Sequence, residues 1–154
     1  MQLTKNFPRD QFDLALASWG WLGLDDQVPM FASLFGDVFL RAPDDGWWYL
    51  DTVEGNVARL WDSQAALVED LSTDAGRDRY LLEALAVGAA GRGLTLGPNE
   101  VYHFMPPPVL GGTFDIANIV VYDFAVAVGL SGQLHDQVRH LPPGTSISGF
   151  RLES

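Results

Sequence analysis

The sequence predicts a single α+β domain in which a small antiparallel β-meander packs with several helices. Its 154 residues are enough to bury one core without disulfides or structural metals. Hydrophobic residues make up 47% and aromatic residues 12%, which excludes an intrinsically disordered chain. Three short β-rich runs separated by turn residues indicate the meander, and apolar residues at helical spacing flank it. No internal repeat or linker divides the chain.

Residues 1–34 are expected to form an N-terminal stub, a short helix followed by a loop, ahead of the main domain at 35–154. Phe12, Leu16 and Trp19 recur at spacings of four and three, which places them on one face of a helix. Glycines just after this helix are expected to end it. The apolar run from Met30 to Phe35 follows neither a helical nor a strand spacing, so its secondary structure stays open.

Residues 36–61 carry the pattern of the meander. The runs GDVFLRA, WYLDT and VARLW are rich in β-formers, and the DDG and EGN segments between them are turn signals. Asp44 and Asp45 suit such a turn, because aspartate side chains accept hydrogen bonds from nearby backbone amides. Trp47 and Trp48 are consecutive, so a strand sends them to opposite faces, and both can be buried only if the sheet is covered on each side.

Two helices are expected after the meander. Asp62 or Ser63 can cap the first, since a short oxygen side chain accepts hydrogen bonds from the free amides at a helix start. The second is predicted over residues 76–90, before the glycine-rich GRGLTLGP segment. Its candidate inward residues are Tyr80, Leu81, Leu85 and Val87.

The C-terminal third is expected to contain a rigid loop, a strand and a helix. Three successive prolines and two glycines predict an ordered loop in PNEVYHFMPPPVLGGTF. The Ile-Val-Val run in residues 118–122 predicts a buried strand, and Asp123 can cap the segment after it. The periodicity is mixed from Phe124 and helical from Ser131, so we expect a helix that stops at Leu141 before two prolines. The alternating tail SISGFRL can add a last strand.

Acidity is the strongest signal in the composition, with a net charge of −11. The segment from Asp25 to Asp74 contains eleven carboxylates but only two cationic residues, Arg41 and Arg59. Nucleic acids and anionic membranes bind through Lys and Arg, so neither is an expected partner. Two interpretations stay open: a solvated surface that keeps the protein soluble, or a field that steers a basic protein partner in.

The chain contains no cysteine, which removes disulfides and thiolate chemistry and suits a reducing compartment. Neither a signal peptide nor an apolar stretch long enough to span a membrane is visible. A cytoplasmic location is therefore expected.

The sequence lacks the motifs of the common catalytic and cofactor sites. There is no nucleophile elbow, phosphate-binding loop, dinucleotide fingerprint or EF-hand. His135 and His140 are five residues apart and do not share a helix face, so no metal site is expected. His103 lies in an aromatic run, where a packed histidine and a catalytic base or ligand both stay open. We expect no cofactor and no enzymatic activity.

The meander supplies the candidates for binding a protein partner. Exposed tryptophan is enriched at interface hot spots, and carboxylates beside it would attract a basic surface. The candidate partner-binding residues are Asp44, Asp45, Trp47, Trp48, Asp51 and Glu54.

Two long segments resemble a known family. The run VYHFMPPPVLGG, and after it NIVVYDFAVAVGLSGQLHDQVRHLPPGT, is similar to the C-terminal domain of immunity proteins that protect bacteria against DNase toxins delivered by type VI secretion. The segment GDVFLRAPDDGWWYLDTVEGNVARLW resembles the opening sheet of the same domain, so the similarity covers residues 35–145. The resemblance implies an antitoxin-like protein that neutralises a basic toxin such as a nuclease. The alternative is a non-catalytic regulatory or scaffold domain.

Overall fold

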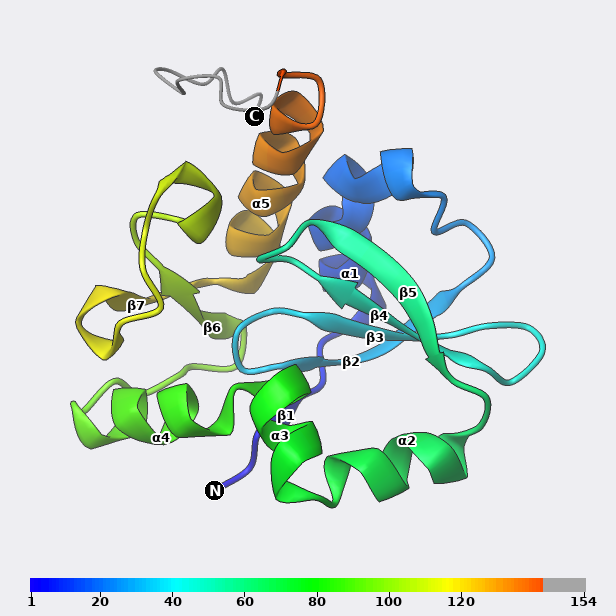
Figure 1. Ribbon diagram of the computed structural model, residues 1–154, viewed down its shortest axis with the longest axis horizontal. Coiled ribbons are helices and arrows are strands. Elements are labelled where there is room, and N and C mark those ends of the chain that lie inside the picture. Colours follow the sequence, from blue (N-terminus) through cyan, green and yellow to red (C-terminus); the bar gives the residue numbers. More distant parts are fainter. Residues whose placement is uncertain (143–154) are drawn as a thin grey trace.

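The structure, a computed structural model, describes residues 1–142 (Figure 1). The strand expected in the SISGFRL tail lies outside the described residues. The fold is α+β, as predicted, with one five-stranded antiparallel sheet, one two-stranded sheet and helices around them.

The five-stranded sheet contains, in spatial order, β1 (Thr4–Lys5), β2 (Val28–Ser33), β3 (Val38–Arg41), β4 (Trp47–Asp51) and β5 (Asn56–Trp61). The smaller sheet pairs β6 (Glu100–Phe104) with β7 (Ile119–Asp123). The helices are α1 (Arg9–Leu16), α2 (Gln64–Leu71), α3 (Asp74–Leu81), α4 (Glu83–Gly91) and α5 (Phe124–Val138). Short 3-10 turns are η1 (Ala17–Leu22), η2 (Pro108–Leu110) and η3 (Ile116–Asn118).

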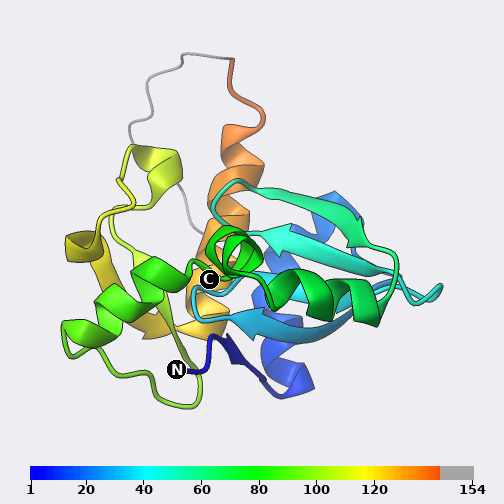
Figure 2. The same ribbon diagram turned by 60° about the horizontal axis from the view of Figure 1, so that its bottom comes forward.

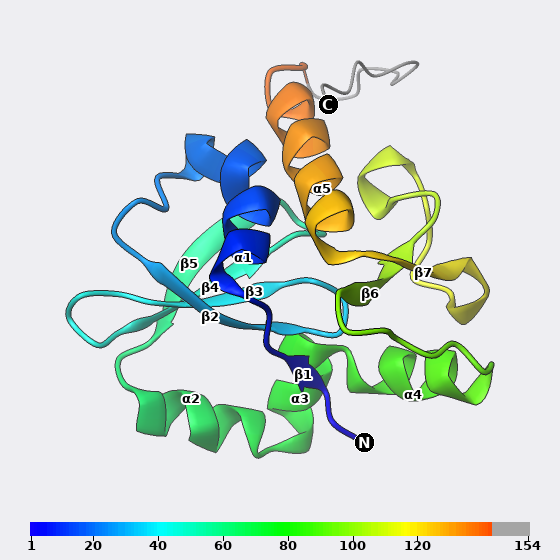
Figure 3. The same cartoon turned by 180° about the vertical axis from the view of Figure 1, so that it is seen from behind.

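The predicted meander is strands β3, β4 and β5. Leu50 of β4 pairs with Val38 on one side and with Val57 on the other, which fixes the register of all three strands. The segment expected as a stub supplies two further strands, because β2 pairs with β3 and β1 pairs with β2. It also supplies α1, which lies beside α5 (Figure 3).

Both faces of the five-stranded sheet are covered. One core cluster lies between the sheet, helices α2 to α4 and β6; it includes Phe39, Tyr49, Trp61, Leu67 and Tyr102. A second cluster lies under α1, η1 and α5; it includes Phe12, Trp19, Leu40, Leu50 and Phe124. Consecutive residues of a strand therefore enter different cores.

The N-terminal helical segment continues beyond Trp19, the last residue of the predicted helix face, and changes type. The α-helical part ends at Leu16, and η1 continues it to Leu22. Gly23, at φ +73°, ends the turn in the left-handed conformation that glycine adopts without strain. Trp19 is fully buried, and its Nε1 donates to the Val128 carbonyl of α5 at 2.9 Å.

The single helix predicted over residues 76–90 is wrong. The chain breaks at Leu82, which has a φ of +50°, and forms α3 and α4 instead. The break lets α3 pack on the larger sheet while Ala86 and Ala89 of α4 pack in the cluster that includes β6 (Figure 2). Val87 consequently points outward with 54% of its surface exposed, contrary to its predicted inward position.

The sequence predicted the helix caps correctly, but it did not predict the bounds of the C-terminal helix and strand. Ser63 accepts a hydrogen bond from the Ala66 amide, and Asp123 accepts one from the Val126 amide, as their positions predict. Helix α5 includes the mixed stretch from Phe124 but ends at Val138, three residues before the expected end. Strand β6 lies in a segment that the prolines had marked as loop.

Candidate functional site

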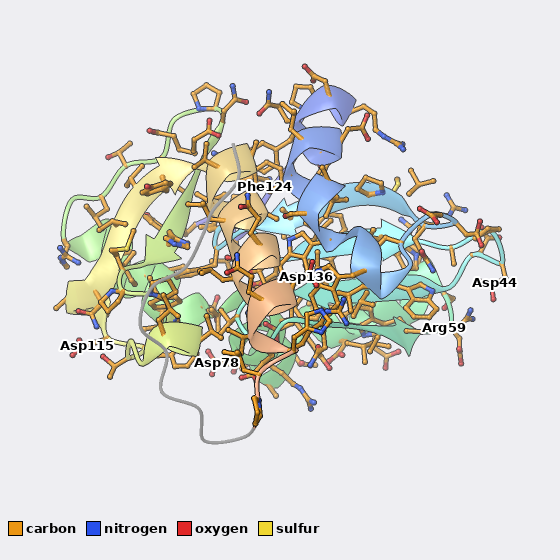
Figure 4. The ribbon with its side chains drawn as sticks, turned by 90° about the horizontal axis from the view of Figure 1, so that it is seen from above. Asp44, Arg59, Asp78, Asp115, Phe124 and Asp136 are labelled. Carbon is orange, nitrogen blue, oxygen red and sulfur yellow. The ribbon has the colours of Figure 1, made fainter. Side chains whose placement is uncertain are left out.

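The six predicted partner-binding residues lie on β4 and the turns at its two ends, and they do not form one patch. Asp44 and Asp45 occupy the β3–β4 turn, next to the start of β4. Asp51 and Glu54 lie at the opposite end of β4, where the chain turns toward β5. Figure 4 shows Asp44 at the tip of the hairpin, well away from Asp136 on α5. The strand therefore separates two acidic turns.

The carboxylates of the β3–β4 turn are held by arginines. Asp45 forms an ion pair with Arg41 at 2.6 Å, and Asp44 forms one with Arg59. Asp44 also accepts a hydrogen bond from the Gly46 amide, which confirms its predicted role in the turn. The hydrogen bond from Arg59 lowers the pKa of Asp44. Two of the predicted negative charges are thus locally compensated.

The second acidic turn has no such compensation within residues 1–142. Asp51 accepts hydrogen bonds from the amides of Val53 and Glu54, both at 3.0 Å. Glu54 is exposed, and neither carboxylate forms an ion pair with a described residue. This turn presents its negative charge to a partner more openly than the β3–β4 turn does.

Trp47 and Trp48 do point to opposite faces of the sheet. Trp47 is 4% exposed and belongs to the first core cluster, whereas Trp48 is half-buried at the border of the second. The indole Nε1 of each is covered and has no hydrogen-bond partner. Because the sheet is covered on both sides, both rings contribute to packing, and a binding role for either stays a prediction.

Sequence reasoning missed a buried polar centre behind the second turn. The Asp37 carboxylate accepts hydrogen bonds from the Thr52 amide at 2.9 Å and the Thr52 hydroxyl at 2.8 Å. The Ser33 hydroxyl donates to the other oxygen at 3.2 Å. Burial, and after it the negative charge of Asp51, raises the pKa of Asp37 to about 7. An aspartate beside a glycine before a strand is typical of an exposed turn, so nothing local in the sequence marks its burial.

His135 connects this polar centre to α5. Its Nε2 lies 3.0 Å from the Thr52 carbonyl oxygen, and its ring packs at 5.8 Å from Trp19. Burial lowers the pKa of His135, which favours a neutral imidazole. Together, Asp37, Thr52 and His135 fix the second acidic turn against the core and α5.

Gly55 is expected to be intolerant of a side chain because it lies against this histidine. It has a φ of +76°, and a Cβ there would lie 2.3 Å from His135 Nδ1. Gly55→Ala should therefore lower the free energy of unfolding by about 1–3 kcal/mol, which urea denaturation measures. Gly91→Ala is the control, since nothing lies within 4 Å of a Cβ at that position. Equal stability of the two variants would contradict the described packing.

His103 is a packed residue beside a very small cavity. Its ring lies 5.4 Å from that of Tyr122, and burial lowers its pKa. The cavity that it shares with His135 measures about 20 Å³, which is room for a water molecule rather than a substrate. Among residues 1–142, no three His, Cys, Asp or Glu side chains are grouped so that they could hold a metal ion.

The cationic side chains are engaged within the protein. Five of the eight described Lys and Arg residues form ion pairs with carboxylates: Arg9, Arg41, Arg59, Arg77 and Arg139. Lys5 and Arg92 donate to backbone carbonyls, and Arg79 lies over the Tyr80 ring. Within the described chain, no helix has the length and apolar character to cross a membrane.

One protein family matches just under half of the chain, in its middle and C-terminal parts. A model of the family described as T6SS immunity protein Tdi1, C-terminal, matches residues 62–135. No curated protein matches the chain. A solved structure, the crystal structure of Atu4351 from Agrobacterium tumefaciens, is 18% identical with a TM-score of 0.54, over 81% of this chain and 62% of its own. That likeness shows the fold. Residues 62–135, from the residue after β5 to His135 in α5, are thus similar to the Tdi1 C-terminal family of T6SS immunity proteins.

Proposed function

We propose that this protein is an immunity protein that binds and neutralises a basic toxin, such as a type VI secretion nuclease, in the cytoplasm. It acts by binding and has no catalytic role. The observation that carries the proposal is the uncompensated negative charge: the net charge is −11, and every described cation already contacts a partner within the chain.

Electrostatic complementarity supports a nuclease as the partner. A nuclease needs Lys and Arg where its polyanionic substrate binds. An acidic protein surface is complementary to the same region, accelerates association and opposes binding of the substrate. The family match supports the immunity role, and the charge distribution supports a basic toxin as the partner.

The contact surface includes the acidic turns and the strongly acidic α2–α3 segment. The candidates on β4 and its two turns remain Asp44, Asp45, Trp47, Trp48, Asp51 and Glu54. Residues 62–83 contain six carboxylates and two arginines, a net charge of −4. Glu69 and Asp78 of this segment are exposed and form no ion pair with described residues. These two carboxylates are free to attract a basic partner.

Reversing these two charges should weaken the complex. We expect Glu69→Lys with Asp78→Lys to lower affinity for a basic toxin about tenfold or more, mainly through slower association. The probe is a catalytically inactivated toxin encoded by the gene adjacent to that of this chain, measured by surface plasmon resonance.

The matched control is Asp25→Lys with Asp26→Lys, which changes the net charge equally. These residues come after η1, and their neighbours Leu22 and Leu24 pack on the second core cluster, on the other face of the sheet from α2 and α3. A selective loss in the α2–α3 variant supports the proposed contact surface. Unchanged association of both variants would contradict a basic partner, and equal losses would contradict a contact at α2–α3.

A further inference from the structure

An apolar groove runs between the N-terminal strand and helices α2 and α3. Its volume is about 510 Å³, and its apolar lining includes Leu3, Phe31, Trp47, Leu67 and Leu71. Thr4 of β1 and Leu81 of α3 both line it, and α2 continues along the same edge of the molecule (Figures 1 and 3). Groove residues thus come from the sheet on one side and from the helices on the other.

One feature distinguishes this groove from an ordinary surface hollow. Val68, on the α2 side, is 55% exposed although it lines the groove together with the buried side chains of Leu67 and Trp47. A partner's apolar side chain placed there would remove this exposed valine surface from water.

The charge beside the groove indicates which kind of ligand fits. The lining itself contains no carboxylate, and its Arg77 side chain pairs with Asp74 and Glu83. Exposed carboxylates come next to lining residues in the chain: Glu69 follows Val68, and Asp78 follows Arg77. An apolar groove bordered by exposed carboxylates is complementary to a segment that carries an apolar side chain next to Lys or Arg.

We propose that this groove is the docking site for a basic segment of the toxin, which inserts an apolar side chain against Val68. The proposal rests on the proposed immunity function. It places the main anchor at α2 and β4, within reach of the acidic β3–β4 turn: Asp44 pairs with Arg59, which also contacts Asp62 just before α2. The second acidic turn, at Asp51 and Glu54, lies at the other end of β4.

A valine pair provides a matched test. Val68 and Val87 are both helical valines, with 55% and 54% of their surfaces exposed, but Val87 lies on α4 outside the groove lining. Titration calorimetry with the inactivated toxin should show at least a tenfold loss of affinity for Val68→Gln and less than a twofold change for Val87→Gln.

The outcomes separate this inference from the function on which it rests. If the wild-type chain does not bind the toxin, the proposed function fails. If the wild-type chain binds and Val68→Gln binds equally well, only the groove inference fails. Light scattering adds a further check: a wild-type dimer that Val68→Gln converts to a monomer would overturn the inference, because a second copy would then occupy the groove.

Discussion

Trp19→Ala is expected to lower the free energy of unfolding by about 3–5 kcal/mol, the range for removing a large buried aromatic side chain. The indole is fully buried between the sheet and α5, and it packs 5.8 Å from the Trp21 ring. Its Nε1 donates to the Val128 carbonyl, so alanine leaves both a cavity and an unpaired buried acceptor. Urea denaturation followed by circular dichroism measures this loss without depending on tryptophan fluorescence.

The control for this substitution is Leu14→Ala on the same N-terminal segment. Leu14 is 61% exposed, so its removal should change stability by no more than about 0.5 kcal/mol. A loss below about 1 kcal/mol for Trp19→Ala would contradict the integration of η1 into the second core cluster. The comparison therefore tests whether the first 34 residues are part of the cooperative fold.

Asp37→Asn is expected to change how stability depends on pH. In the folded protein burial raises the pKa of Asp37 to about 7, against an ordinary value of 3.8. The folded state therefore holds this proton more tightly than the unfolded state does. The resulting stabilisation is present below the unfolded pKa and is lost as the pH rises through the folded pKa. Over roughly three pH units the loss is on the order of 4 kcal/mol.

Asparagine at position 37 keeps an acceptor for Thr52 and has no proton to lose. The stability of Asp37→Asn relative to wild type should therefore rise between about pH 4 and about pH 8, as the wild type ionises. His135 also titrates, but it is present in both proteins, so its contribution cancels in this difference. Urea denaturation across this pH range measures the difference. A stability difference that does not change with pH would contradict a buried, strongly shifted Asp37.

Local signals predicted the meander and the helix caps well. The DDG and EGN segments are turns, Asp44 accepts from the Gly46 amide, and Ser63 and Asp123 cap their helices. Each of these features depends on residues within four positions of one another. Short-range chemistry of this kind is readable from a single sequence.

The errors arose where distant packing decided the structure. Leu82 adopts a left-handed conformation inside a stretch with helical composition, and the break lets α3 pack on the larger sheet while α4 packs beside η3. Strand β6 forms because β7 pairs with it from nearly twenty residues away. Neither outcome can be read from the residues that immediately surround the position concerned.

The site was predicted by residue type better than by arrangement. Strand β4 and its two turns carry all six candidates, but ion pairs with Arg41 and Arg59 compensate one turn, and β4 separates that turn from the other. The buried centre at Asp37 was missed because its partner Thr52 is fifteen residues away. The groove at Val68 depends on three segments that meet only in the folded chain. The sequence shows charge and aromatic content, while the fold decides which of these residues face a partner.

Survival of cells that produce the active adjacent toxin tests the central claim most directly. Cells that also produce the wild-type chain should survive, whereas cells with the vector alone should die. Protection should persist with Val87→Gln and fall with Val68→Gln combined with Glu69→Lys and Asp78→Lys, provided that both variants accumulate as folded protein. Death of cells that contain abundant, folded wild-type protein would contradict the claim that this chain neutralises that toxin.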